Sequence, residues 1–168
     1  MLTRIAVVTG AAATSLVLLA ALAGCSSSGG GSAITVQSAK QKTIAYEKVI
    51  SGYLPAADIK STQITSTSKV IFPCLNQSGK SYWPGSTTLQ VVDGLNTSDL
   101  LDSIASKWNA KAGNSAFVNT SANGNKSLSM KSADGYSFTV EFDQGPVFSI
   151  TALSACFANA GLAGKTSY

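Results

Sequence analysis

Two acidic residues near the carboxyl end of the chain are spaced so that they could act together. Glu141 and Asp143 lie two positions apart in the segment 136–143, in which apolar and polar residues alternate. Residues two apart in a strand point to the same face, about 7 Å apart. Paired carboxylates serve glycosidases and bind calcium. The same pair is also typical of the wet face of an ordinary strand, and the sequence has no EF-hand loop or second acidic cluster.

Two further groups of side chains are candidates for binding. The polar residues of the same strand would form a ligand platform if this face of the sheet were concave, and would otherwise be solvent-exposed surface: Ser137, Thr139, Glu141 and Asp143. Tyr82-Trp83, followed by Pro84-Gly85, is an aromatic pair in a predicted loop. Exposed aromatic side chains are good anchors for a protein partner or a glycan. The alternative is that Trp83 packs over the edge of the sheet.

The composition argues against most catalytic chemistry. The chain has no histidine, and Arg4 is its one arginine. Acid–base catalysis most often uses histidine, zinc sites need histidine or several cysteines, and bidentate phosphate binding uses arginine. The remaining basic residues are lysines scattered along the chain, which is not the pattern of a nucleic-acid-binding surface. No nucleophile or phosphate-loop motif is present. We therefore expect no cofactor, no metal, no nucleic-acid partner and no enzymatic activity.

The beginning of the sequence has the layout of an export signal. Arg4 precedes an uncharged stretch over residues 5–23, and Leu22-Ala23-Gly24-Cys25 ends it. A short positive region, an apolar region and small residues are typical of a signal peptide. The stretch is also just long enough to span a bilayer, so an uncleaved anchor is the alternative. The run Ser26-Ser27-Ser28-Gly29-Gly30-Gly31-Ser32 that follows is typical of a flexible tether.

The leader resembles those of bacterial lipoproteins. With the tether, a pair of cysteines at 74 and 156 and the segment Gly135-Tyr136-Ser137-Phe138-Thr139-Val140, the chain resembles small lipoproteins of actinobacteria. The resemblance implies that Cys25 is lipidated and becomes the first residue after cleavage. It implies a location on the outer face of the cytoplasmic membrane. It carries no functional residue other than Cys25.

Four regions follow along the chain. We expect a signal peptide over 1–24, a lipidated Ser/Gly-rich tether over 25–37, one globular domain over 38–158 and a flexible tail over 159–168. An exported protein occupies a compartment in which disulfides persist, so Cys74 and Cys156 are predicted to pair. The alternative, a reactive thiol, lacks a histidine that could act as its base.

The hydrophobic pattern predicts the elements of this domain. Helices are expected over 38–54 and 98–112, and extended segments over 64–72, 87–92, 116–121, 126–131, 136–143 and 147–156. In the first helix, Glu47 is placed with the lysines on the solvent side. In the second helix, Thr97 or Ser98 is expected to cap the start and Gly113 to end it in the left-handed conformation. The core-facing stripe of this second helix is predicted to be Leu100, Leu101, Ile104, Ala105 and Trp108. Asn123-Gly124 predicts a type I′ turn. Phe72, Cys74 and Cys156 are all predicted to face inward.

These elements predict an α+β fold with two layers. An antiparallel sheet of about five or six strands carries two helices on one face, because each element has one apolar side to bury. The predicted function is that of a lipid-anchored, non-enzymatic binding or accessory protein that recognises an envelope protein or a small ligand. Alternatives are a cell-wall glycan hydrolase that uses Glu141 and Asp143, and a structural or inhibitory lipoprotein.

Overall fold

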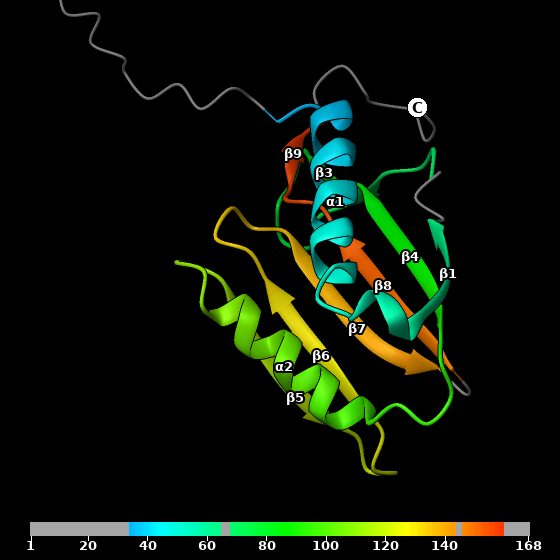
Figure 1. The fold of residues 1–168 in the computed structure, drawn as a ribbon. Coiled ribbons are helices and arrows are strands. Elements are labelled where there is room, and N and C mark those ends of the chain that lie inside the picture. The colour runs from blue at the N-terminus through cyan, green and yellow to red at the C-terminus, as the bar shows by residue number, and fades with distance from the viewer. Residues whose placement is uncertain (1–33, 65–67, 144–145, 160–168) are drawn as a thin grey trace, which may run out of the picture. The chain divides into compact units, whose positions relative to one another are not determined.

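The core of the molecule is an antiparallel sheet covered on one face by two helices (Figure 1). The computed structural model describes residues 34–64, 68–143 and 146–159. The predicted signal peptide, Cys25, most of the tether and residues 160–168 of the predicted tail lie outside these ranges. Among the described residues, no helix combines the length and the apolar character needed to cross a membrane.

Helix α1 precedes all the strands, and α2 lies between β4 and β5. Their bounds are α1 Val36–Ser51, a 3-10 turn Ala56–Asp58, β1 Ile59–Ile64, β2 Phe72–Pro73, β3 Lys80–Tyr82, β4 Pro84–Val91, α2 Thr97–Asn109, β5 Ser115–Thr120, β6 Lys126–Lys131, β7 Ser137–Asp143, β8 Val147–Leu153 and β9 Phe157–Ala158. The main sheet has six strands in the order β1-β4-β8-β7-β6-β5, and a small sheet has the order β2-β3-β9. All pairings are antiparallel, which confirms the predicted α+β class.

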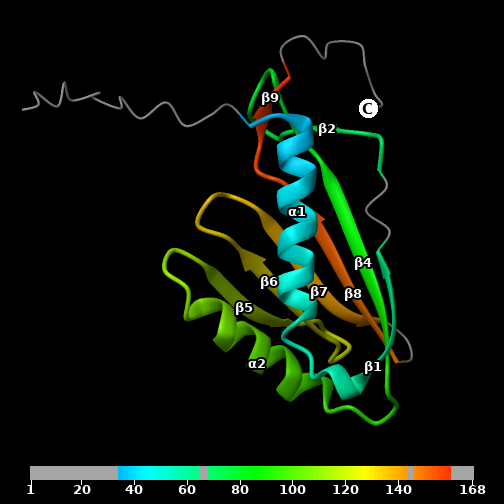
Figure 2. The same ribbon diagram turned by 45° about the horizontal axis from the view of Figure 1, so that its top comes forward.

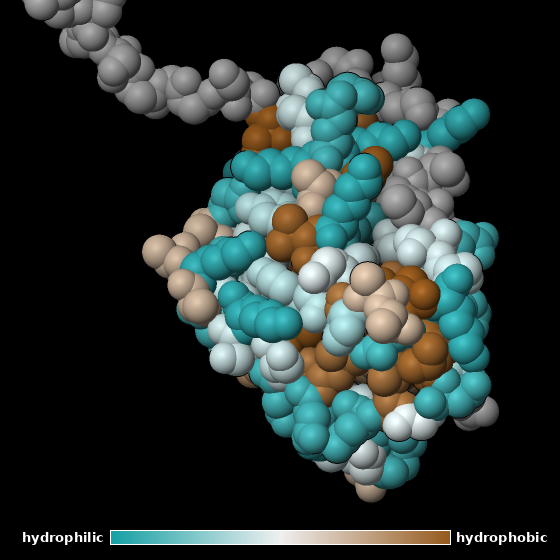
Figure 3. Space-filling view, in the orientation of Figure 1, coloured by the Kyte–Doolittle hydropathy of each residue, from teal (hydrophilic) through white to brown (hydrophobic). Residues whose placement is uncertain are grey.

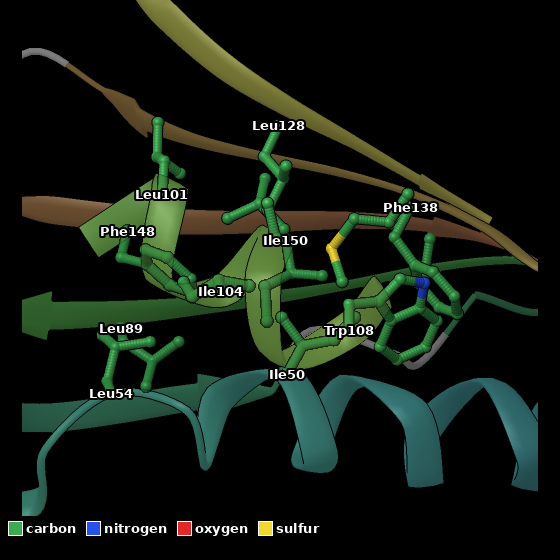
Figure 4. Close-up of a cluster of buried hydrophobic side chains, with 14 of the residues drawn as sticks. Ile50, Leu54, Leu89, Leu101, Ile104, Trp108, Leu128, Phe138, Phe148 and Ile150 are labelled. Carbon is green, nitrogen blue, oxygen red and sulfur yellow. The ribbon is translucent and has the colours of Figure 1, made fainter. Parts of the chain in front are cut away.

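The hydrophobic core lies between the helices and the main sheet. Side chains from α1, α2 and the central strands point toward one another in this layer (Figure 4). Trp108 is fully buried on α2, as predicted, and its indole N–H donates to the carbonyl of Lys131 at 3.0 Å. The opposite face of the sheet carries mostly serine and threonine, and none of the described helices covers it, so the described part of the domain has two layers.

Helix α1 begins with a capping box and buries a stripe that includes a carboxylate. The side chain of Thr35 accepts from the backbone N–H of Ser38, and the side chain of Ser38 accepts from the backbone N–H of Thr35. The buried positions are Ala39, Thr43, Glu47 and Ile50. The prediction that Glu47 faces solvent is therefore wrong. The spacing of four between 39, 43 and 47 places all three on the side toward the sheet.

Helix α2 is shorter than predicted and starts on a different cap. The side chain of Asn96 accepts from the backbone N–H of Asp99, so Asn96 is the cap rather than Thr97 or Ser98. The helix ends at Asn109 instead of 112, and Gly113 has the predicted positive φ, at 77°. Its buried residues, Leu101, Ile104, Ala105 and Trp108, all belong to the predicted stripe. The core-facing side of this helix was thus readable from the sequence.

The hairpin β5–β6 exists, but its turn differs from the prediction. A type I′ turn requires positive φ at both central residues. Here Gly124 has φ 84°, and Asn76 is the one described non-glycine residue with a positive value. The backbone N–H of Ser121 donates to the carbonyl of Asn125, which encloses a three-residue loop. Such loops have a type I turn followed by one left-handed residue, and glycine takes that place readily.

The two cysteines pair, but not in the core. Cys74 and Cys156 form a disulfide with a Cα–Cα distance of 6.4 Å, which confirms the predicted pairing. Both are half-buried, and Phe72 is exposed, so the expectation that all three face the core is wrong. Only Phe72 and Pro73 of this segment pair as a strand. The inward phase predicted for Cys74 therefore already fails in β2, and the phase predicted for Cys156 does not continue past the end of β8 at Leu153.

Candidate functional site

The predicted aromatic pair lies where two strands meet rather than in a longer loop: Tyr82 is the last residue of β3, and Trp83 is the single residue between β3 and β4. Tyr82 ends β3 and is half-buried, with its ring stacked on Phe72 at a centroid distance of 5.8 Å. Trp83 is 1% exposed and packs with Ala39 and Phe157. Its indole N–H donates to the carbonyl of Ser68 at 2.9 Å. Trp83 is thus a core residue, as the alternative interpretation held, and of the pair only Tyr82 is in a position to touch a ligand.

A groove opens beside Tyr82 at one end of the uncovered sheet face. Its volume is about 470 Å³, within the range of roughly 300–1,000 Å³ of small-molecule sites. The residues that line it are Phe72, Pro73, Cys74, Leu75, Tyr82, Gly135, Ser137, Leu153, Ser154 and Cys156. We call this feature the disulfide groove. It brings together Tyr82 and Ser137, two predicted binding residues that lie 55 positions apart in the sequence.

The walls of the disulfide groove come from three parts of the chain. Phe72 and Tyr82 stand on paired strands of the small sheet, directly opposite each other. Leu153 ends β8 and is paired with Ser137, the first residue of β7. The disulfide joins the small sheet to the segment after β8. Because a covalent bond closes this end of the site, its walls are restrained in the folded state.

Three large apolar side chains are exposed around the groove. Leu75 is 89% exposed, Phe72 45% and Leu153 37%. Isolated exposed apolar residues are ordinary, whereas several around one concave site indicate a binding surface. None of these three was predicted as a site residue. One feature of the sequence could have indicated them. In the stretch Phe72-Pro73-Cys74-Leu75-Asn76, two large apolar residues flank a proline and a cysteine next to a predicted turn.

The other predicted platform residues lie farther along β7. Thr139 is opposite Ser129 and Thr151, and Glu141 is opposite Ser127 and Ser149. Both Thr139 and Glu141 are exposed, and neither lines the groove. The side chain of Asp143 lies outside the part of the chain that the structure describes. Catalysis by the carboxylate pair therefore stays the alternative hypothesis.

A second cluster fixes the turn that forms one side of the groove. The Asp134 carboxylate accepts from Tyr46 Oη at 2.8 Å and from Ser132 Oγ at 2.5 Å, and Lys42 Nζ is 2.5 Å away. Burial alone would raise the pKa of Asp134, but hydrogen bonds from Lys42, Ser132 and Tyr46 lower it below its ordinary value. This cluster ties α1 to the turn before Gly135, which itself lines the groove.

The basic side chains of the helix-bearing side are largely solvated. Hydrophilic side chains cover most of α1 in the space-filling view (Figure 3). Lys42 approaches the ring of Tyr136, and Lys107 and Lys111 approach the ring of Tyr53, with distances of 5.5–5.8 Å to the centroids. These lysines accompany the aromatic residues of the core edge and form no concave site. The helix-bearing side is therefore a weaker candidate than the disulfide groove.

The side chains around the groove suit some ligands better than others. Within residues 34–64, 68–143 and 146–159, no three histidine, cysteine, aspartate or glutamate side chains gather closely enough to hold a metal ion. The groove offers apolar contact, a few hydroxyl groups and a tyrosine, which suit binding by burial of apolar surface. No protein-family model, curated protein or solved structure matches this chain.

Proposed function

We propose that this chain is a lipid-anchored, non-enzymatic binding protein on the outer face of the cytoplasmic membrane, and that the disulfide groove receives its ligand, a small molecule or part of an envelope protein. The observation that carries the proposal is the groove itself, an apolar concavity of about 470 Å³ closed at one end by a disulfide. The sequence features that support the location are Arg4, the uncharged stretch over 5–23 and Cys25.

The arrangement favours binding for a physical reason. A ligand that displaces water from Phe72, Leu75 and Leu153 gains roughly 25 cal/mol for each Å² of apolar surface buried. Restraint of the walls by the Cys74–Cys156 bridge reduces the entropy lost on binding. Tyr82 and Ser137 add a limited number of polar atoms that can orient the ligand. A lipid-anchored domain with such a groove can act as a receptor or accessory protein without catalytic residues.

Photo-crosslinking in the native envelope tests the groove. p-Benzoylphenylalanine in place of Tyr82 should form a discrete adduct with a lipid, another small molecule or a protein. The same group in place of Phe117, which is 60% exposed on β5 and does not line the groove, is the matched control. Equal labelling at both positions, or none at position 82, would overturn the proposal.

Mass spectrometry of the native protein tests the anchor. The proposal expects an amino-terminal cysteine that corresponds to Cys25 and carries at least a diacylglyceryl group. An intact Met1 terminus with no added lipid would contradict this part of the proposal. The two experiments are independent, because the groove does not include Cys25.

A further inference from the structure

We infer that the ligand of the disulfide groove is an anionic lipid of the adjoining membrane, with an acyl chain in the groove and its headgroup beside Lys80 and Lys131. The inference rests on the proposed function, in that it takes the groove to be a ligand site, and it adds the chemical class of the ligand. Three features support it: the apolar lining, the charges around it and the end of the domain on which it lies.

The first feature is the chemistry of the lining. The residues of the groove include no charged side chain. Phe72, Leu75, Tyr82 and Leu153 contribute apolar surface, and the disulfide contributes a further weakly polar group. A fatty-acyl chain makes no hydrogen bonds and is stabilised by such a surface through burial alone. A peptide would bring backbone N–H and C=O groups, each of which needs a partner.

The second feature is the charge beside the groove. Lys80 lies two residues before Tyr82 on β3, so the two side chains leave the same face of the strand. Lys131 is paired with Ser137, which lines the groove. Both lysines are exposed. Within the described residues the salt bridges are Lys42–Asp134 and Lys60–Asp93, so neither Lys80 nor Lys131 is neutralised by an acid there.

The third feature is the position of the groove relative to the start of the domain. Ile71, Trp83 and Phe157 belong to the cluster that packs against Ala39, in the first turns of α1. Their chain neighbours Phe72, Tyr82 and Cys156 line the groove. The groove and the beginning of α1 therefore lie at the same end of the domain, where both ribbon views place β9 (Figures 1 and 2).

This position brings the groove within reach of a membrane. The nine peptide steps from Cys25 to Ile34 span at most about 30 Å when fully extended. A lipid on Cys25 would thus keep this end of the domain near the bilayer surface. Leu75, the most exposed large apolar residue of the described chain, is part of the groove and lies at the same end.

Fluorescence quenching by brominated lipids tests the inference on the full lipidated chain in vesicles. Leu75→Trp and Ser137→Trp place reporters at the exposed edge and on the sheet floor of the groove, and Phe117→Trp is the control on the same open face. The native Trp83 and Trp108 are buried and give a constant background. We expect several-fold stronger quenching at positions 75 and 137 than at 117 when phosphatidylglycerol brominated on its acyl chains is mixed into phosphatidylcholine vesicles.

A charge reversal completes the test. Lys80→Glu combined with Lys131→Glu should raise the mole fraction of phosphatidylglycerol needed for half-maximal quenching by at least about fivefold, the effect expected of one lysine near an anionic surface. Quenching at position 75 but not at 137 would mean that the bilayer only touches the domain, and would overturn the inference. So would quenching that is indifferent to the reversal.

The outcomes separate the inference from the function on which it rests. A protein adduct at position 82 in the crosslinking experiment, without quenching at 137, would leave a binding protein whose ligand is not a lipid. Neither adduct nor quenching would remove both. Disulfide formation in each tryptophan variant, measured by mass, shows whether the variant has folded around the groove.

Discussion

Glu47 of α1 and Thr87 of β4 meet in the interior of the domain, where the carboxylate oxygen Oε2 accepts from the hydroxyl group at 3.0 Å. Glu47 is fully buried, and Thr87 is buried too. The pair joins the first helix to a central strand of the sheet. Because a buried carboxylate is costly without hydrogen bonds, its surroundings must be fitted closely around it.

The first prediction concerns Gly85, which leaves room for this carboxylate. A Cβ atom at position 85 would lie 2.5 Å from Glu47 Oε1 and 2.9 Å from atoms of Thr43 and Trp83. We expect Gly85→Ala to lower the free energy of unfolding by about 1–3 kcal/mol through overpacking. Denaturant titration measures the change. Gly52→Ala is the control, since residue 52 has an ordinary helical φ of −70° and should change stability by under about 1 kcal/mol. Equal effects would contradict the prediction.

The second prediction concerns pH and the Asp134 cluster. Burial opposes ionisation of this carboxyl, but hydrogen bonds from Lys42, Ser132 and Tyr46 lower its pKa in the folded state. A lowered folded pKa gives stability that is present above the unfolded pKa and is lost as pH falls through the folded pKa. We expect the stability difference between the natural chain and Asp134→Asn to be constant near neutral pH and to shrink below about pH 4.

Lys42, the basic member of the same cluster, affects stability in the opposite direction at alkaline pH. The hydrogen bond to Asp134 raises the pKa of Lys42 in the folded state. The contribution of Lys42 to folding stability is therefore complete below its ordinary pKa of 10.5 and is lost as the pH rises through the folded pKa.

Tyr46→Phe removes one hydroxyl donor to Asp134 and should lower the free energy of unfolding by about 1 kcal/mol at neutral pH. Denaturation curves from pH 2 to 7 decide the matter. A difference for Asp134→Asn that did not depend on pH over this range would refute the assigned role.

The third prediction concerns the disulfide. It links residues 82 positions apart, and in the chain-entropy model such a link stabilises by about 4–5 kcal/mol as an upper figure. Cys74→Ser with Cys156→Ser should lower stability by up to that amount and abolish ligand binding in the groove. The natural chain under reducing conditions should behave like the double variant, and the double variant should be insensitive to reductant. Retained binding after reduction would show that the walls hold without the bridge.

The fourth prediction separates Tyr82 from Trp83. Trp83 fills the core, so Trp83→Ala should cost about 3–5 kcal/mol and lose binding only by unfolding the domain. Tyr82→Ala removes an aromatic ring from the wall of the groove and should therefore reduce binding, while the thermal unfolding temperature changes little. Calorimetry on both variants, and the vesicle quenching assay with each change combined with Ser137→Trp, give the comparison. A Tyr82→Ala protein that binds normally would remove this residue from the site.

The fifth prediction concerns Glu141. If the groove is the functional site, Glu141→Gln should bind phosphatidylglycerol like the natural chain, because Glu141 does not line the groove. The natural chain should release no soluble fragments from purified cell wall. Release that Glu141→Gln abolishes would instead support the hydrolase interpretation.

Local pattern predicted the elements far better than their environment. Strand β6 has the predicted bounds, and the stripe of α2 through Leu101, Ile104 and Trp108 was read correctly, because each depends on one face repeated at a fixed period. Glu47 was misplaced because a charged residue is normally assigned to solvent. Ala39 and Thr43 precede Glu47 at intervals of four residues, so all three share one face of the helix. This spacing indicates burial of Glu47 in spite of its charge.

The groove could not have been found by the same reasoning. Tyr82 and Ser137 were proposed for separate sites, and they meet because β4 pairs with β8 and β8 with β7. Both residues of β2, Phe72 and Pro73, are exposed, so this strand has no alternation from which the exposure of Phe72 could be predicted. Long-range pairing of this kind is a property of the whole sheet, which a local window does not contain.

The order of the strands also bears on how the chain reaches its final shape. Strand β8 lies between β4 and β7, so the sheet's middle is filled by almost the last strand to appear along the chain. Before β8 arrives, the pair β1–β4 and the meander β5–β6–β7 share no hydrogen-bonded edge. Non-local closure of this sort delays assembly. We therefore expect the two parts of the sheet to join only after β8, Val147–Leu153, has paired with both of them.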